Sequence, residues 1–355
     1  MTRQIHVGGI PIGGGAPVTI QSMTNTRTDD VESTLSQIRS LAAAGCQIVR
    51  VAVPDGAAAR AVAKIKEASP LPVVVDIHFD YKLALEAIAA GADKVRINPG
   101  NIGGEDRVKA VADACRLRGI PIRIGVNGGS LEKGLLAKYG GVCPEAMVES
   151  AFGHIRLLNK FDFDDICVSL KSSSVPMTMR AYQLMREKSD YPLHIGVTEA
   201  GTVRMGTLKS AVGIGGLLAL GIGDTMRVSL SADPVEEVYA ARDILKAAGV
   251  RREGAELVSC PTCGRTRIDD RPGCPGGGAA EGGGQAHHGG GDGLCRQRAG
   301  GGVCRRLRDR GRHRRRPPVP KRGDREKGPP GPAGGRAVCP DRGTVTQGAL
   351  HHPTD

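Results

Sequence analysis

The sequence predicts a (β/α)8 barrel (TIM barrel) of the α/β class, because three of its features agree on that fold. Short β-branched runs alternate with Ala- and Leu-rich helical stretches through residues 1–250. Eight such pairs follow one another, and about 250 residues is a typical length for this fold. We therefore expect residues 1–250 to form one barrel domain.

The predicted strands are short runs rich in Val and Ile. They span residues 18–23, 48–53, 73–78, 94–99, 122–127, 166–171, 193–199 and 226–230. The predicted helices alternate with them and span residues 31–44, 57–68, 81–90, 107–118, 144–159, 176–187, 207–220 and 234–248. Many of these helices end at a Gly, which is a common C-terminal cap.

A doubly wound open sheet is the alternative fold for alternating strands and helices. That fold usually carries a Gly-rich dinucleotide-binding loop after its first strand. Here Gly13–Gly15 precedes the first predicted strand. We therefore interpret this triplet as a surface turn and retain the barrel.

The net charge of +12 is concentrated at one end of the sequence. Residues 271–355 hold 17 Lys and Arg against 7 Asp and Glu, and the preceding part is almost neutral. The barrel is therefore not expected to bind nucleic acid. Neither a signal peptide nor an apolar run of membrane-spanning length is present, which predicts a cytoplasmic protein without a membrane partner. In that compartment, cysteines indicate thiols or metal ligands rather than disulfides.

Polar side chains gather at the C-terminal ends of the predicted strands, where barrel enzymes build their active sites. Arg50, Arg96 and Arg227 lie inside apolar runs, and a guanidinium there must be paired or face a polar pocket. The full set is Gln21, Ser22, Thr24, Arg50, Asp76, His78, Arg96, Asn98, Arg123, Asn127, Lys171, Glu199, Arg227 and Ser229. Several cations around one cavity predict a ligand with phosphate groups. Glu199 is either a proton donor or base, or a salt-bridge partner of these cations.

Cys260 and Cys263 form a Cys-x-x-Cys loop after the last predicted helix. Such a loop suits zinc, a redox dithiol or two thiolates of an iron–sulfur cluster. No second pair follows for a zinc ribbon, and a thioredoxin-like motif would stand early in its own fold. We favour a cluster with further ligands downstream. We interpret the earlier cysteines as packing residues: Cys46, Cys115, Cys143 and Cys167.

Taken together, these motifs resemble the bacterial 4-hydroxy-3-methylbut-2-enyl diphosphate synthase family of the non-mevalonate isoprenoid pathway. The matching segments include VTIQSMTN, VDIHF, VRINPGNIG, IGVNGGSLE, VSLKSS, GVTEAG, GIGGLL and CPTCGR, in this order along residues 1–270. So many collinear motifs make a chance similarity very improbable. The resemblance makes residues 1–250 the substrate domain and residues 251–270 the start of a small α+β iron–sulfur domain.

The resemblance implies a reaction, a cofactor and partners. The reaction is the reductive ring opening and dehydration of 2-C-methyl-D-erythritol 2,4-cyclodiphosphate to 4-hydroxy-3-methylbut-2-enyl diphosphate. Glu199 would donate a proton near the departing hydroxyl, and Cys260 and Cys263 would hold a [4Fe–4S] cluster that receives electrons from flavodoxin or ferredoxin. The protein would be a homodimer in which the cluster domain of one subunit caps the other's barrel. The implied diphosphate-binding residues are Arg50, Arg96, Arg123, Lys171 and Arg227, supported by Asn98, Asn127 and Ser229.

Residues 271–355 depart from the family pattern. They contain 22 Gly but no Ile, Met, Phe or Tyr, and the family motif GCVVNGPGE, which carries a third Cys and a Glu ligand, is absent. A natural, disordered basic tail is one interpretation. We favour translation of a GC-rich gene in the wrong frame. Codons that suit Asp292–Gly302, read one nucleotide later, encode MGCVVNGPGE.

The sequence thus predicts a barrel followed by a largely disordered, out-of-frame tail. The chain as written would hold no stable cluster and would be inactive. One alternative is a cluster-free, phosphate-binding barrel with a nucleic-acid-binding tail. Another is a barrel aldolase or isomerase that forms a Schiff base at Lys171. Neither accounts for Cys260 and Cys263.

Overall fold

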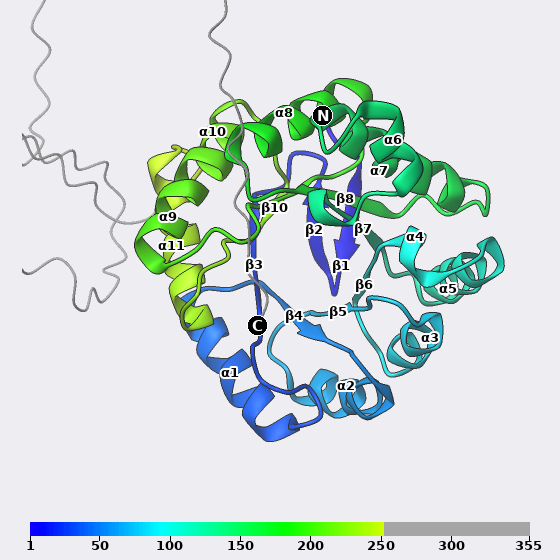
Figure 1. Cartoon of the computed structure of the whole chain (residues 1–355). Coiled ribbons are helices and arrows are strands. Elements are labelled where there is room, and N and C mark those ends of the chain that lie inside the picture. Colours follow the sequence, from blue (N-terminus) through cyan, green and yellow to red (C-terminus); the bar gives the residue numbers. More distant parts are fainter. Residues whose placement is uncertain (252–355) are drawn as a thin grey trace, which may run out of the picture. The chain divides into compact units, whose positions relative to one another are not determined.

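The computed structural model describes residues 1–251, which form a parallel β-barrel surrounded by helices (Figure 1). The barrel strands neighbour one another in the order β8-β7-β6-β5-β4-β3-β10-β9. Each predicted strand overlaps an observed one, although β9 and β10 have only two residues each and β10 shares only Met226 with its prediction. The predicted fold class is confirmed. The strands are β3 (Thr19–Met23), β4 (Ile48–Ala52), β5 (Val73–Asp76), β6 (Lys94–Ile97), β7 (Ile122–Asn127), β8 (Ile166–Lys171), β9 (His194–Ile195) and β10 (Thr225–Met226).

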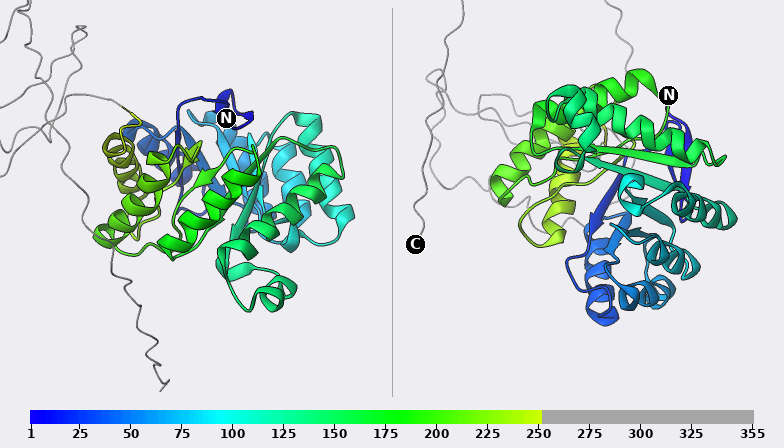
Figure 2. Two further views of the ribbon diagram at one scale, coloured as in Figure 1. Left: turned by 90° about the horizontal axis from the view of Figure 1, so that it is seen from above. Right: turned by 45° about the vertical axis from the view of Figure 1, so that its right-hand side comes forward.

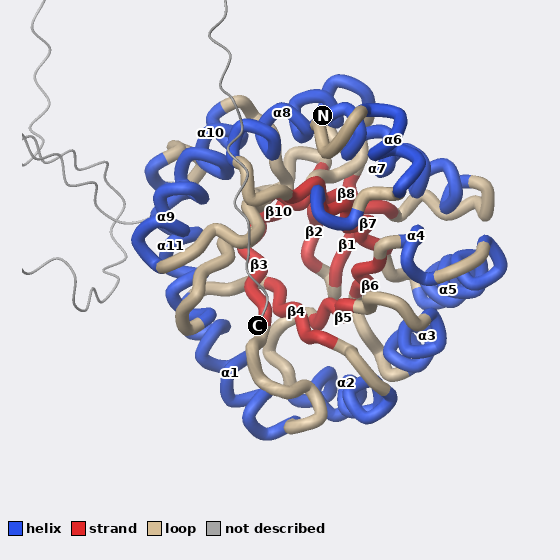
Figure 3. The backbone as a smooth tube through the Cα atoms, viewed as in Figure 1, coloured by secondary structure: helices blue, strands red, loops and turns tan. Residues whose placement is uncertain are grey.

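Helices cover the outside of the barrel (Figure 3). Those at predicted positions are α1 (Val31–Ala44), α2 (Gly56–Ala68), α3 (Tyr81–Ala89), α5 (Glu105–Arg118), α7 (Pro144–Asn159), α8 (Val175–Lys188) and α11 (Pro234–Ala247). Four of them begin at an Asp whose side chain accepts a hydrogen bond from a backbone N–H of the first turn, which is a strong helix-start signal. No helix in residues 1–251 combines the length and the apolar character needed to cross a membrane.

One predicted helix, residues 207–220, is divided in the structure. It consists of α9 (Val203–Ser210), a π-helical turn (Ala211–Gly215) and α10 (Gly216–Ala219). Three glycines in this stretch lower its helix propensity, and a π turn is a common local adjustment inside a helix. Two short helices were not predicted, α4 (Pro99–Ile102) and α6 (Lys133–Tyr139).

An N-terminal hairpin that was not predicted lies at one end of the barrel (Figure 2). Its strands, β1 (Gln4–Val7) and β2 (Ile10–Gly13), pair antiparallel around Gly8 and Gly9, which both have positive φ. Its apolar side chains cluster with Ile48, Val74 and Cys167 from the barrel interior. The hairpin therefore packs against the interior at the N-terminal ends of the strands. Gly14 and Gly15 form the predicted turn directly after it.

The barrel closes at a seam between β8 and β9. One parallel bridge joins Val168 to Leu193. Beside it, the buried hydroxyl of Tyr182 on α8 accepts a hydrogen bond from the N–H of Leu170 at 3.0 Å and donates one to the carbonyl of His194 at 2.6 Å. A side chain thus links two strands where the backbone ladder is short.

Candidate active site

A polar cavity of about 260 Å³ lies at the C-terminal ends of the barrel strands. Five cationic side chains and one carboxylate line it. The lining residues are Met23, Arg50, Asp76, His78, Arg96, Arg123, Asn127, Ser169, Lys171, Thr198, Arg227 and Ser229. The cavity lies at the end of the barrel where this fold places its active sites.

Strand alternation explains why these side chains face the cavity. Successive residues of a strand point to opposite faces. On β8, Ser169 and Lys171 face inward, while Val168 and Leu170 pack in the apolar layer between strands and helices. The same alternation turns Arg50 inward between Val49 and Val51, so an arginine within an apolar run faces the polar interior.

Asp76 is the carboxylate of the cavity, and cations surround it. Arg96 Nη1 lies 3.0 Å from Asp76 Oδ1, and Arg50 Nε lies 3.7 Å from Oδ2. His78 Nε2 lies 3.6 Å from Oδ2. Burial alone would raise the pKa of Asp76, but the charge of Arg50, the nearby ring of His78 and the charge of Arg96 hold it well below its usual range. Asp76 is therefore a fixed negative charge that positions two arginines.

Arg227 is held from outside the cavity by Glu237 on α11. Its Nε donates to Glu237 Oε2 at 3.2 Å, and its Nη2 donates to Oε1 at 3.1 Å. Glu237 is buried and also accepts hydrogen bonds from Ser22 Oγ and the Leu230 N–H. This paired arrangement gives the Arg227 guanidinium one orientation.

Arg50 and Arg123 are less fully compensated than Arg96 and Arg227 within residues 1–251. Arg50 donates to the sulfur of Met23 at 3.0 and 2.8 Å, and a thioether is a weak acceptor. Arg123 Nε and Nη1 are buried and have no hydrogen-bond partner in this part of the chain. Burial, reinforced by the charge of Arg96, lowers the pKa of Arg123 to about 10. An oxyanion ligand would supply the missing acceptors and charge.

The charged form of Lys171 is likewise destabilised in the cavity. Burial and the charges of Arg123, Arg227, Arg50 and Arg96 hold its pKa well below its ordinary value. A bound anion would oppose each of these charges. The cavity is therefore suited to a multiply charged anion.

Gly125 leaves the space that the guanidinium of Arg96 occupies. A Cβ atom at this position would collide with Arg96 Nε and Nη2. The glycine on β7 thus leaves room for Arg96, whose contact Asp76 is its register partner on the neighbouring strand β5.

Among the barrel residues predicted to bind substrate or to donate a proton, all except Asn98 and Glu199 line the cavity. Asn98 does not line the cavity: its buried side chain accepts a hydrogen bond from the Gly100 N–H at 3.1 Å and caps α4. Glu199 is exposed and follows Thr198, which does line the cavity. Glu199 has a positive φ of 51°, a conformation that costs energy for a non-glycine residue and is common at functional sites.

Other strand-end residues take different positions. Ser22 faces α11 rather than the cavity, and Gln21 lies deeper in the barrel with its amide unpartnered among residues 1–251. Met23, Ser169 and Thr198 line the cavity but were not predicted. Their inward direction follows from period-two alternation, so counting in twos from Lys171 would have identified Ser169.

The barrel supplies no iron–sulfur ligand set. In residues 1–251, no group of three or more His, Cys, Asp or Glu is arranged to hold a metal ion. Cys46, Cys115 and Cys167 are buried, as expected for packing residues. Cys143 is partly buried and caps α7 by accepting a hydrogen bond from the Ala146 N–H. Cys260 and Cys263 lie outside the described residues.

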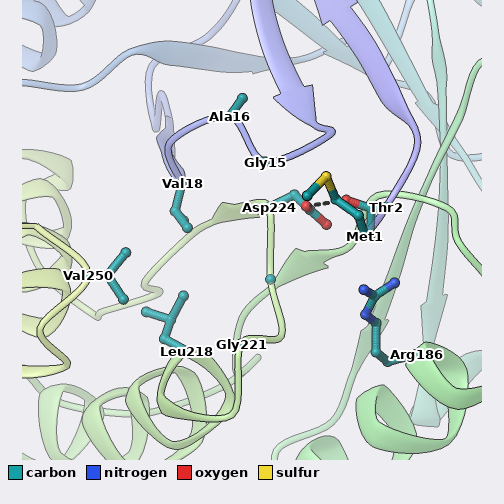
Figure 4. Close-up of a pocket in the computed structure, with 11 residues that line it drawn as sticks. Met1, Thr2, Gly15, Ala16, Val18, Arg186, Leu218, Gly221, Asp224 and Val250 are labelled. Atoms are coloured by element: carbon teal, nitrogen blue, oxygen red, sulfur yellow. Dashed lines mark hydrogen bonds between the residues drawn. The ribbon is translucent and has the colours of Figure 1, made fainter.

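A second cavity, of about 280 Å³, lies beside the N-terminal segment (Figure 4). Its carboxylate, Asp224, accepts hydrogen bonds from Thr2 Oγ1 at 2.6 Å and from the Leu193 N–H at 2.8 Å. Arg186 is the cation on its wall. Because Asp224 is already satisfied by the protein, this cavity is a weaker candidate for a ligand site.

The sequence of the barrel is similar to a known protein family. Residues 2–242 match the family model of the GcpE TIM-barrel domain. The chain is 60% identical over 269 residues to a 4-hydroxy-3-methylbut-2-en-1-yl diphosphate synthase (flavodoxin) from Caldanaerobacter subterraneus, covering 76% of each chain. The synthase of the same name from Geobacter sulfurreducens is 60% identical over 76% of each chain. The one from Bacillus subtilis is 59% identical over 76% of this chain and 71% of its own length. The chain therefore belongs to the GcpE family.

Proposed function

We propose that the cationic cavity binds 2-C-methyl-D-erythritol 2,4-cyclodiphosphate for its reductive ring opening and dehydration to 4-hydroxy-3-methylbut-2-enyl diphosphate. The similar proteins are named synthases of this product, so the family is one of oxidoreductases in isoprenoid biosynthesis. The observation that carries the proposal is the ring of five cations around a single carboxylate. A ligand with two negatively charged phosphates fits that imbalance.

In this proposal the lining residues divide into two roles. Arg50, Arg96, Arg123, Lys171 and Arg227 bind the phosphate oxygens, with Asn127 and Ser229 donating or accepting hydrogen bonds at the wall. Asn98 supports the site indirectly by fixing the start of α4.

Glu199 is proposed as the proton donor for the departing hydroxyl. It stands beside the cavity wall, next to Thr198, and is open to solvent that can reprotonate it. The left-handed backbone at Glu199 supports a functional role, because strained backbone conformations of this kind cluster at active sites.

The proposed cofactor is a [4Fe–4S] cluster, which supplies electrons to the substrate, and the proposed donor is flavodoxin, with ferredoxin as the alternative. Cys260 and Cys263 would be two of its ligands, within residues 251–270. The proposed donor set is incomplete in this sequence, because residues 1–251 hold no group of three or more potential metal ligands and residues 271–355 lack the family motif. We therefore expect the chain as written to bind substrate without turning it over.

We further propose that residues 271–355, which lie outside the described residues, are an out-of-frame translation. The match to the relative from Caldanaerobacter subterraneus covers 76% of both chains. The unmatched parts of the two proteins are therefore of similar length. A frameshift removes similarity while it can preserve length. Resequencing the genomic DNA that encodes residues 260–305 should reveal one missing or additional base. An intact reading frame there would contradict the proposal.

The protein is proposed to be a homodimer. Phe79 follows His78 of the cavity and is 71% exposed, so a second subunit that covers the cavity would bury an apolar side chain at its rim. Light scattering of the frame-corrected protein should give the dimer mass. The near-neutral barrel predicts no binding to nucleic acid, and the proposed setting is the cytoplasm.

The central experiment compares the chain as written with the frame-corrected chain. Calorimetry should show that both bind the cyclodiphosphate, whereas only the corrected chain forms product after anaerobic cluster reconstitution. Arg123→Met should weaken binding of the cyclodiphosphate both in the chain as written and in the frame-corrected chain. Full cluster absorbance and turnover by the chain as written would contradict the proposal. Borohydride trapping of a carbonyl substrate at Lys171 would instead favour an aldolase.

A further inference from the structure

A second layer of polar side chains lies beneath the cavity, inside the barrel. Gln21, Lys94 and Thr225 each stand two positions before a cavity-lining residue of the same strand or its continuation, so they face the same interior. His194 joins them through a contact of 3.4 Å between its Nδ1 and Thr225 Oγ1. Barrel interiors at this depth are usually filled by branched aliphatic side chains.

Lys94 is the cation of this layer, and it has no counter-ion there. Its side chain is completely buried, and Nζ has no hydrogen-bond partner among residues 1–251. Its register partner on β5, Val74, belongs to the apolar cluster around the N-terminal hairpin. Asp76, the carboxylate of the cavity above, is already engaged by Arg96 and Arg50.

The groups that influence Lys94 come from several strands. Arg50 on β4 and Arg123 on β7 are cations, and Cys167 lies on β8. Burial lowers the pKa of Lys94 to about 8. Burial also raises the pKa of Cys167, which stays a thiol, and holds the pKa of His194 well below its ordinary value, so that the ring is neutral. Lys94 is thus poised to change its charge, whereas these neighbours are not.

We propose that Lys94 is a proton-binding site coupled to the cavity, which takes up a proton when a doubly charged anion binds above it. The cavity arginines and Lys94 then share the compensation of the ligand charge, and Lys94 favours dianions over monoanions. This inference rests on the proposed function for the identity of the natural ligand. The buried, unpaired amine and the uncompensated cations next to it carry the argument.

Thermodynamic linkage determines how the affinity for the anion changes with pH. A bound anion stabilises the ammonium form, so the pKa of Lys94 is higher in the complex than in the free protein. Affinity is therefore constant below about pH 8 and decreases above it, by up to tenfold per pH unit, until the pKa of the complex is reached. Lys171, on the cavity wall, adds its own contribution in the same direction.

The test is calorimetric titration of the full chain at about pH 8.5 in two buffers that differ in ionisation enthalpy. The cyclodiphosphate is the first probe, because its phosphates carry no proton that titrates near this pH. We expect Lys94→Met to take up measurably less proton per bound ligand than the unmodified chain, by up to one. Because Lys171 is present in both proteins, the difference isolates Lys94. The exposed Lys64→Met should match the unmodified chain.

Lys94→Met should fold, because it replaces an unpaired buried amine by an apolar side chain of similar size. Thermal melting checks that Lys94→Met is folded. If Lys94→Met does not fold, Lys94→Gln is used in its place. Sodium sulfate, a dianion that does not titrate in this range, is the second probe. Equal proton uptake in the variant and the unmodified chain overturns the inference. Binding of sulfate with the expected difference, but not of the cyclodiphosphate, overturns the proposed function alone. Binding of neither anion overturns both.

Discussion

Arg227, just beyond β10, and Glu237, on α11, form a two-point contact, with Nε–Oε2 and Nη2–Oε1 distances of 3.2 and 3.1 Å. The same carboxylate accepts from Ser22 Oγ on β3. One buried acid therefore fixes a cavity-lining arginine and ties the last helix to the first barrel strand.

Replacing Glu237 by Gln should destabilise the barrel. The amide keeps the size of the side chain but loses the charge and one of its two acceptor positions, so the partly buried guanidinium of Arg227 loses part of its pairing. We expect a loss of about 1–3 kcal/mol in the free energy of unfolding, measured with urea. Glu236→Gln, an exposed neighbour on the same helix, is the matched control and should change little. Equal stability of the two variants would show that the pair is unimportant.

Removing the hydroxyl of Tyr182 should weaken the barrel seam. Tyr182→Phe leaves the Leu170 N–H and the His194 carbonyl without their buried partner, and each unsatisfied group costs about 1–3 kcal/mol. Urea denaturation should report the loss, while Tyr239→Phe, on an exposed tyrosine, serves as control. A variant as stable as the control would mean that the backbone bridge alone closes the barrel.

A methyl group at Gly125 should impair ligand binding. Its Cβ would occupy the position of the Arg96 guanidinium, which would have to leave Asp76. We expect Gly125→Ala to lower the affinity for the cyclodiphosphate about tenfold or more, which corresponds to about 1.4 kcal/mol. Gly153→Ala, where a Cβ meets no neighbour within 4 Å, should bind normally. Unchanged affinity in Gly125→Ala would remove Arg96 from the binding set.

Asp76 should contribute stability that depends on pH. Because its pKa in the folded protein is lowered by Arg50, His78 and Arg96, its contribution is fully present above about pH 5. That contribution decreases as pH falls below the unfolded value of about 3.9, and it is lost only as pH falls through the lower pKa of the folded protein. Asp76→Asn should therefore lose about 3 kcal/mol at pH 7, and the gap to the unmodified chain should narrow towards pH 3.5. Urea denaturation at several pH values measures the gap, and a constant gap would contradict this assignment.

The backbone of Glu199 should carry a measurable energetic cost. Its φ of 51° suits glycine, so Glu199→Gly should raise stability by about 0.5–1 kcal/mol while abolishing turnover in the frame-corrected enzyme. Asp162, with a φ of 54°, gives the control, since Asp162→Gly should gain stability without losing activity. Retained turnover in Glu199→Gly would exclude Glu199 as the proton donor.

Much of the site could be read from periodicity. An arginine or lysine within an apolar strand has to face a polar interior, and the strand ends of a barrel converge, so Arg50, Arg123 and Lys171 could be assigned to one cavity before the structure was known. Asn98 could not be separated from them, because its capping of α4 depends on a turn whose geometry the residue pattern does not specify.

The sequence by itself determined the barrel and the family, because both follow from local periodicity and short motifs. The tertiary structure decided which polar groups pair. Glu237 meets Arg227 and Ser22, Tyr182 spans the seam, and the N-terminal hairpin packs against the interior beneath the unpaired Lys94. These contacts join residues from separate elements, so they form only when the helices pack on the barrel. Local sequence patterns do not specify which buried polar groups then meet, or which, like Lys94, stay unpaired within residues 1–251.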